Sequence, residues 1–335
     1  MKEIYEASSG MGEVSESTLK FSGKGKIKNN NLFTSISKAF GLFFASQMVS
    51  MILITVYLVH TNFTKEETAE GVGYNFSLGM SEIFSTNSIL ILLLSEIFMI
   101  AVFVLYARFK DNLSLQSLGF VRKNMPVSYL AGGAGAALSM LVLALICKAT
   151  GAMVFTHDAA NVPLLILFAV GFVIQGLAEE VMCRGYLIAH ITRRYSVKTA
   201  VIASSILFAL LHAFNPSGIS FLALINLFLF GVFASLMFLY SENIWLCAGF
   251  HTVWNFVQGN VIGVPVSGIP IPSIFKMNAN ENMSIINGGV FGLEGGIPVT
   301  VILVTGCVIL YFLIKRKEKN AKKPFSEGVS ENSIK

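Results

Sequence analysis

Long stretches of apolar residues recur along almost the whole of this 335-residue chain. An α-helix needs about 20 mainly apolar residues to cross the hydrocarbon core of a bilayer. Eight stretches reach or approach that length, and the fifth and the seventh are short. They are 36–59, 88–107, 127–147, 163–191, 198–213, 219–240, 244–263 and 297–314. The pattern predicts an all-α fold, a polytopic transmembrane bundle of about eight spans.

The composition supports this fold class. Only 13% of the residues are charged and the mean hydropathy is +0.69, whereas a soluble domain carries about 25% charged residues. The four cysteines lie inside apolar runs without CxxC or CxxH spacing, so neither a disulfide framework nor a cysteine zinc site is expected. The first thirty residues lack the pattern of a cleavable signal peptide. The expected surroundings are a lipid bilayer, with no nucleic-acid partner.

The basic residues predict the orientation of the spans. If the N-terminus is cytoplasmic, twenty Lys and Arg residues fall in cytoplasmic segments and only three, Lys65, Lys148 and Lys276, fall on the outer side. Cytoplasmic loops carry an excess of Lys and Arg, so both termini are expected inside. The predicted parts are a disordered cytoplasmic tail (1–30), two spans with a basic loop (31–120), a core (121–314) and a basic cytoplasmic tail (315–335).

Six polar residues lie within three of the spans, where an unpaired charge costs several kcal/mol. Any one of them alone would be explained as a polar contact between helices, but six together favour a functional site. No serine or cysteine stands out as a nucleophile. The six are Glu179, Glu180 and Arg184 in 163–191, His212 in 198–213, and His251 and Asn255 in 244–263.

Helical spacing separates these residues by role. Glu180 and Arg184 are four residues apart and can pair, while Glu179 lies about 140° of rotation from Arg184 and is left without a partner. A free carboxylate near an imidazole is typical of a general base. His251 and Asn255 share one helix face and could donate hydrogen bonds to an oxyanion. Together the groups predict hydrolysis of an acyl bond by activated water.

Three short motifs occur in order within these spans. They are Glu179-Glu180-x-x-x-Arg184, Phe208-x-x-x-His212 and His251-x-x-x-Asn255. This order resembles the CPBP intramembrane proteases, which include the Ras-converting CAAX endoprotease and bacterial Abi-type proteases. The segment F-G-L-E-G-G at 291–296 is also similar to one found in bacterial members. The resemblance covers about 120–300.

The resemblance implies an endopeptidase in which Glu179 activates water with His212. His251 and Asn255 would stabilise the oxyanion, and Glu180 and Arg184 would support them. The substrate would be a membrane-associated peptide or protein, prenylated or not. No cofactor is expected, because the HExxH spacing of zinc proteases is absent. If zinc were bound, its ligands would be Glu179, His212 and His251.

The rise along each helix places Glu179 and His251 towards the cytoplasmic half of what is expected to be a bacterial cell membrane. A cavity open to the cytoplasm or to the inner leaflet would then admit the substrate. Three further histidines, His60, His157 and His190, are expected to be ordinary interfacial residues. Two alternatives stay open. One is a transporter or receptor that uses the Glu/His cluster as an ion path, and the other is a catalytically silent immunity or scaffold relative.

Overall fold

The computed structural model describes residues 31–68, 71–76, 82, 84–158, 161–213 and 218–321. The predicted N-terminal tail, 1–30, lies outside these residues. The predicted C-terminal tail is described only as far as residue 321, where it continues a helix.

Helices make up most of the described chain. Six helical segments are long and apolar enough to cross a membrane, and two shorter ones match the predicted fifth and seventh spans. The six are α3 (Leu32–Asn62), α5–α6 (Thr86–Ser95 and Ile97–Phe109), α7 (Met125–Ala149), α8–η1–α9 (Val162–Glu180, Val181–Ile188 and Ala189–Ile191), α11 (Phe221–Ser241) and α14 (Ile297–Ala321); the shorter two are α10 (Val197–His212) and α12–η2 (Trp245–Phe256 and Val257–Ile262). The predicted all-α polytopic bundle is confirmed.

Short polar side chains start several helices where the apolar stretches begin. Asn161, Ser196 and Ser220 each accept a hydrogen bond from the backbone N–H three residues later, at the starts of α8, α10 and α11. Such a cap satisfies one of the N–H groups that a first helical turn leaves without an internal partner. Pro163 adds a fixed φ angle at the start of α8.

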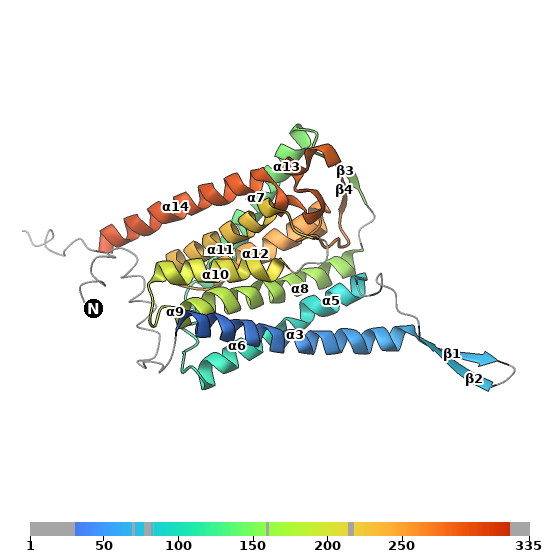
Figure 1. Ribbon diagram of the computed structural model, residues 1–335. Helices are drawn as coiled ribbons and strands as arrows, with labels where there is room; N and C mark the ends of the chain where they lie inside the picture. The colour runs from blue at the N-terminus through green and yellow to red at the C-terminus, as the bar shows by residue number, and fades with distance from the viewer. Residues whose placement is uncertain are drawn as a thin grey trace, which may run out of the picture.

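The two ends of the bundle differ. Helix α3 begins and α14 ends at one end, which we call the terminal end (Figure 1). At the opposite, strand end lie two small antiparallel sheets, β1–β2 and β3–β4. Their strands are β1 (Phe63–Thr68), β2 (Gly71–Phe76), β3 (Met153–His157) and β4 (Phe275–Ala279), and the single-turn helices η3 (Glu281–Met283), α13 (Ser284–Asn287), η4 (Gly289–Phe291) and η5 (Leu293–Gly295) follow β4.

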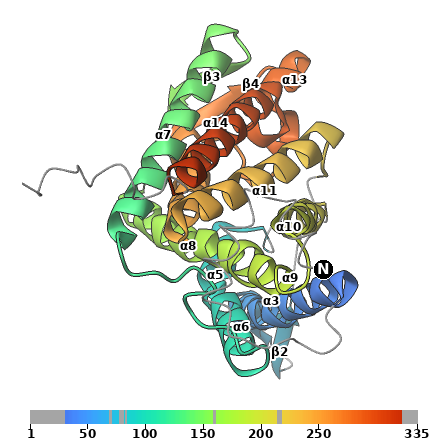
Figure 2. The ribbon, with the colours of Figure 1, turned by 90° about the vertical axis from the view of Figure 1, so that its left-hand side faces the viewer.

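The α8–η1 segment runs through the middle of the bundle. In the end-on view it separates α3, α5 and α6 from α7, α11 and α14 (Figure 2). Within the most apolar part of each helix, 61% of α11 is buried but only 22% of α3 and of α14. Large apolar side chains such as Val301, Phe312 and Met51 are exposed. A membrane supplies the apolar surroundings that these peripheral side chains require.

Candidate active site

Helix α12 lies in close contact with both α7 and α8. A Cβ atom at Gly132 of α7 would lie 2.0 Å from the Leu246 carbonyl oxygen, and one at Gly176 of α8 would lie 2.8 Å from the Thr252 hydroxyl oxygen. Only glycine allows backbones to approach this closely. The packing fixes the depth and rotation of α12, and therefore the position of His251.

Immediately after Glu179 and Glu180, α8 widens into the π-helix η1. Such a widening is rare and occurs frequently at functional sites. Arg184 lies in η1, and its Nη1 donates to Glu180 Oε1 at 2.9 Å with both side chains wholly buried. Its Nη2 donates to the Gly231 carbonyl at 3.2 Å, and its guanidinium lies over the Phe208 ring at 5.0 Å. The pairing expected from the four-residue spacing is present.

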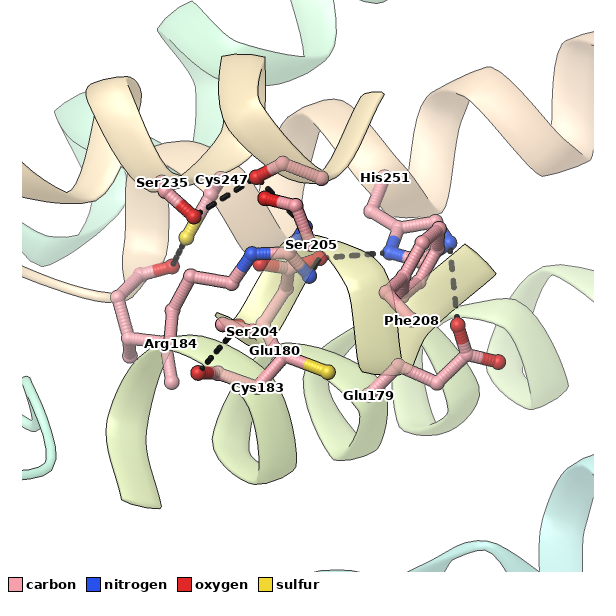
Figure 3. A network of polar contacts seen from close by, with 12 residues as sticks. Glu179, Glu180, Cys183, Arg184, Ser204, Ser205, Phe208, Ser235, Cys247 and His251 are labelled. Carbon is pink, nitrogen blue, oxygen red and sulfur yellow. Dashed lines mark hydrogen bonds and ion pairs between the residues drawn. The ribbon is translucent and has the colours of Figure 1, made fainter. Parts of the chain in front are cut away.

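His251 lies between the two glutamates (Figure 3). Its Nδ1 is 2.9 Å from Glu180 Oε1, and its Nε2 is 3.7 Å from Glu179 Oε2. The short contact requires Nδ1–H to donate to Glu180, because a carboxylate only accepts. Glu180 therefore bonds both Arg184 and His251, and the second of these contacts was not expected from spacing along one helix.

Glu179 belongs to a second chain of contacts. Gln175 Nε2 donates to Glu179 Oε1, and Gln175 Oε1 accepts from Asn255 Nδ2 at 3.0 Å. Within the described part of the chain, no donor bonds to Glu179 Oε2, although this atom is buried. The side chain of Glu179 is 16% exposed, while those of Glu180 and Arg184 are not exposed at all. Of the two adjacent glutamates, Glu179 is thus the one with an oxygen available to a small molecule such as water.

A cavity of about 170 Å³ lies beside this oxygen. Glu179, His212, His251 and Asn255 all line it, so the four predicted catalytic residues lie around one space. His212 Nδ1 is 2.9 Å from the Phe208 carbonyl oxygen, to which it donates, and this leaves its Nε2 free of that contact. No direct hydrogen bond joins Glu179 to His212 among the described residues. The apolar part of the wall includes Ile89, Leu93, Phe172, Val266, Ile269 and Ile271.

Five polar residues that line the cavity were not predicted, namely Glu96, Gln175, Asn226, Ser267 and Glu294. Gln175 precedes Glu179 by one helical turn, and a glutamine in an apolar span is the signal that could have indicated it. Glu96 interrupts an apolar run at the junction of α5 and α6 in the same way. Glu294 belongs to F-G-L-E-G-G, which the sequence singled out without giving its glutamate a role.

Glu294 reaches the cavity because its loop is fixed in position. Its Oε2 accepts from the Ser267 backbone N–H at 2.8 Å and from the Ser267 hydroxyl at 2.9 Å. Asn226 of α11 donates to the carbonyl oxygens of Glu294 and Gly296 at 2.8 and 3.0 Å. Gly292 has φ +88°, and a Cβ there would lie 2.1 Å from the Pro265 carbonyl oxygen. The glycines of the segment are therefore needed for the turn that carries Glu294.

The expectation for His190 was wrong, because this residue is wholly buried and not interfacial. Its Nδ1 lies 3.1 Å from the Ser35 hydroxyl, and its Nε2 lies 3.5 Å from Asp111 Oδ2. Asp111 follows α6, so the contact joins two segments that are far apart in the sequence. Spacing along one helix could not reveal it.

The residues of the cavity do not form a metal site in this arrangement. Among the residues that the structure describes, no three His, Cys, Asp or Glu side chains converge as metal ligands. His251 directs its Nδ1 to Glu180, and His212 directs its Nδ1 to a backbone carbonyl. Such Nδ1 contacts also occur in histidines that bind a metal through Nε2, so only the arrangement of the side chains speaks against a metal site. Among the described residues Glu179, His212 and His251 do not converge on one point, and no step of the reaction below passes through a metal.

The fold and the cavity define a class, that of polytopic membrane proteins with a buried Glu/His site. Residues 160–257 match the family model Rce1-like, described as type II CAAX prenyl endopeptidase Rce1-like. The match contains all three motifs, so the resemblance predicted from the sequence is confirmed. No curated protein matches the chain. Its apolar helices and the membrane-protease family that it matches identify it as a multi-pass integral membrane protein.

Proposed function

We propose that the protein is an intramembrane endopeptidase that hydrolyses a peptide bond with water activated by Glu179 and His212. The observation that carries this proposal is the arrangement at Glu179. One of its oxygens is held by Gln175, the other has no hydrogen-bond donor among the described residues, and both lie at a cavity shared with two histidines. A carboxylate placed in this way can accept a proton from a bound water molecule.

Each group has a defined part in the proposed reaction. Glu179 takes a proton from water while the water oxygen bonds to the peptide carbonyl carbon. His251 is protonated at both ring nitrogens in this step, so that Nδ1–H stays on Glu180 while Nε2–H donates to the oxyanion that forms. Asn255 Nδ2 is the second donor to the oxyanion, and one such donor contributes about 10²–10³ in rate. The carbon–nitrogen bond then breaks as the oxyanion returns to a carbonyl group, and the proton that Glu179 took from water passes to the leaving amine, directly or through His212 Nε2. Glu180 keeps His251 oriented, and Arg184 neutralises Glu180.

The substrate proposed is a peptide or a membrane-associated protein, prenylated or not. The apolar wall formed by Leu93, Phe172 and Ile269 suits an apolar side chain or lipid group next to the scissile bond. The location proposed is a bacterial cell membrane, and the depth of Glu179 and His251 in the cytoplasmic half stays a prediction from the sequence.

The test is cleavage by purified protein in lipid vesicles. Prenylated and unprenylated peptides ending in a CAAX sequence, and a pool of membrane-protein segments, would be incubated with it, and mass spectrometry would identify new termini. The proposal expects new termini that are absent with Glu179→Gln protein. Ion or proton flux through the same vesicles, without cleavage, would support the transporter alternative. Neither flux nor cleavage of any segment would support a catalytically silent relative.

A further inference from the structure

The cavity extends from Glu179 towards one end of the bundle only. Ile89 belongs to the first turn of α5, Asn226 to the second turn of α11, and His212 is the last residue of α10. Each of these positions lies in the part of its helix that is nearer the strand end, as the direction of the helices in Figure 1 shows. Ser267 and Glu294, which also line the cavity, lie in the segments that join η2 to α14 at that end.

Two of these joining segments, 264–271 and 288–296, form what we call the rim of the cavity. Ser267 and Glu294 join the two segments by the hydrogen bonds described above. Val266, Ile269 and Ile271 present their side chains to the cavity and are only partly buried. The rim therefore belongs both to the cavity wall and to the surface of the strand end.

The opposite side of the cavity is closed by aromatic packing. The Phe208 and Phe230 rings stack at 5.7 Å, and the Phe230 ring lies 4.9 Å from that of His251. Arg184, whose guanidinium lies over the Phe208 ring, has no exposed surface. None of the cavity-lining residues comes from the described loops at the terminal end, 110–124, 192–196 and 242–244. Access from that end would require this aromatic layer to separate.

The charge distribution identifies which end faces outwards. The terminal end carries Arg108, Lys110, Arg122, Lys123, Arg193, Arg194 and the basic end of α14, whereas the strand end carries Lys65, Lys148 and Lys276. Excess Lys and Arg marks the cytoplasmic side. The terminal end is therefore cytoplasmic, and the strand end lies on the outer face of the membrane.

We propose that the substrate reaches the cavity from the outer face, across the rim, and that it is a polypeptide segment exposed on that side. The proposal rests on the proposed endopeptidase function, and it differs from the cytoplasmic opening expected from the sequence. Entry from the outer face is compatible with catalytic residues in the cytoplasmic half of the membrane, because the cavity leads from Glu179 towards the outer face. Its substrates are secreted or outward-facing peptides and membrane-protein segments.

The test is thiol labelling in protein whose four native cysteines have been replaced. Ile269→Cys places a thiol in the rim, at a side chain without a hydrogen bond to lose. Thr150→Cys, exposed beyond α7 at the strand end, and Gln116→Cys, exposed in the loop at the terminal end, are the matched controls. Right-side-out and inverted vesicles would be treated with a charged, membrane-impermeant thiol reagent.

We expect Ile269→Cys and Thr150→Cys to be labelled at least ten times faster from the outside, and Gln116→Cys faster from the inside. Three results would overturn the proposal. Ile269→Cys could be labelled faster from the inside, as Gln116→Cys is expected to be, or from neither side. In the third result, Thr150→Cys is labelled faster from the inside and Gln116→Cys faster from the outside. Because labelling needs no cleavage, outside labelling of a protein that cleaves nothing would refute the protease function alone.

Discussion

Two buried clusters of carboxylates and histidines lie along the same continuous helix, α8–η1–α9. The Glu179 cluster comprises Glu179, Glu180, Arg184 and His251, and the Asp111 cluster comprises Asp111, Lys38, Tyr186 and His190. Both contain a carboxylate, a histidine and a cation in largely buried positions. Judged by residue types alone, either cluster could be the functional site.

They differ in how their carboxylates are satisfied. Asp111 Oδ1 accepts from Lys38 at 3.2 Å and Oδ2 accepts from the Tyr186 hydroxyl at 2.7 Å, with His190 at 3.5 Å. Among the residues that the structure describes, no donor bonds to Glu179 Oε2, and Glu179 lines the cavity, which Asp111 does not. A carboxylate bonded at both oxygens joins structural elements, whereas one left open beside a cavity can act on a substrate.

The largest expected contrast comes from removing one charge in each cluster. Glu179→Gln keeps the size of the side chain but cannot take a proton from water, so kcat should fall by about 10³-fold or more. Asp111→Asn should leave kcat within about two-fold and lower Tm. Cleavage kinetics and thermal unfolding of both purified variants would measure this. Equal losses of kcat in two folded variants would remove the distinction between the clusters.

Glu180→Gln should give an intermediate result, because Glu180 both orients His251 and neutralises Arg184. The variant leaves a wholly buried guanidinium unpaired, and breaking a buried pair in this way costs about 3–5 kcal/mol. We expect a loss of folded protein together with a fall in kcat of roughly 10–100-fold, smaller than for Glu179→Gln. Gel filtration in detergent would measure the folded fraction. A normally folded variant with kcat as low as that of Glu179→Gln would instead make Glu180 a direct participant.

The smallest effect concerns the stability of the Asp111 cluster at low pH. Burial alone would raise the pKa of Asp111, but hydrogen bonds from His190, Tyr186 and Lys38 and the charge of His190 lower this pKa to about 2. A carboxyl group whose pKa is lower in the folded than in the unfolded protein stabilises the fold at any pH above the unfolded-state pKa of about 4. This stabilisation is lost as the pH falls from about 4 towards 2. The Tm of wild type should exceed that of Asp111→Asn by a few degrees at pH 6, and this difference in Tm should disappear as the pH is lowered from about 4 to about 2. A constant gap would contradict the assignment.

The sequence predicted the features that follow from one helix at a time. Span positions follow from the length of apolar runs, and the two short spans, 198–213 and 244–263, appear as α10 and α12–η2. The Glu180–Arg184 contact follows from four-residue spacing. The three motifs indicated the matched family.

Contacts between helices were beyond this reasoning. The bond from His251 to Glu180, the Asn255–Gln175–Glu179 chain and the burial of His190 against Asp111 depend on how helices cross. These crossings are fixed by close approaches such as that of Gly132 to Leu246, which no periodicity in the sequence reveals. The rim was missed for a related reason, because its two segments, 264–271 and 288–296, are held together by hydrogen bonds between Ser267 and Glu294, which lie 27 residues apart.

The most direct test of the account is to follow the oxygen of the attacking water. Purified protein would cleave its substrate for a single turnover in H₂¹⁸O, and mass spectrometry would examine the product and the enzyme peptide that contains Glu179. If Glu179 acts as a general base, the new carboxyl terminus gains one ¹⁸O while Glu179 gains none and no peptide becomes bound to the enzyme. Heavy oxygen in Glu179, or a peptide bound covalently to the quenched enzyme, would contradict the account.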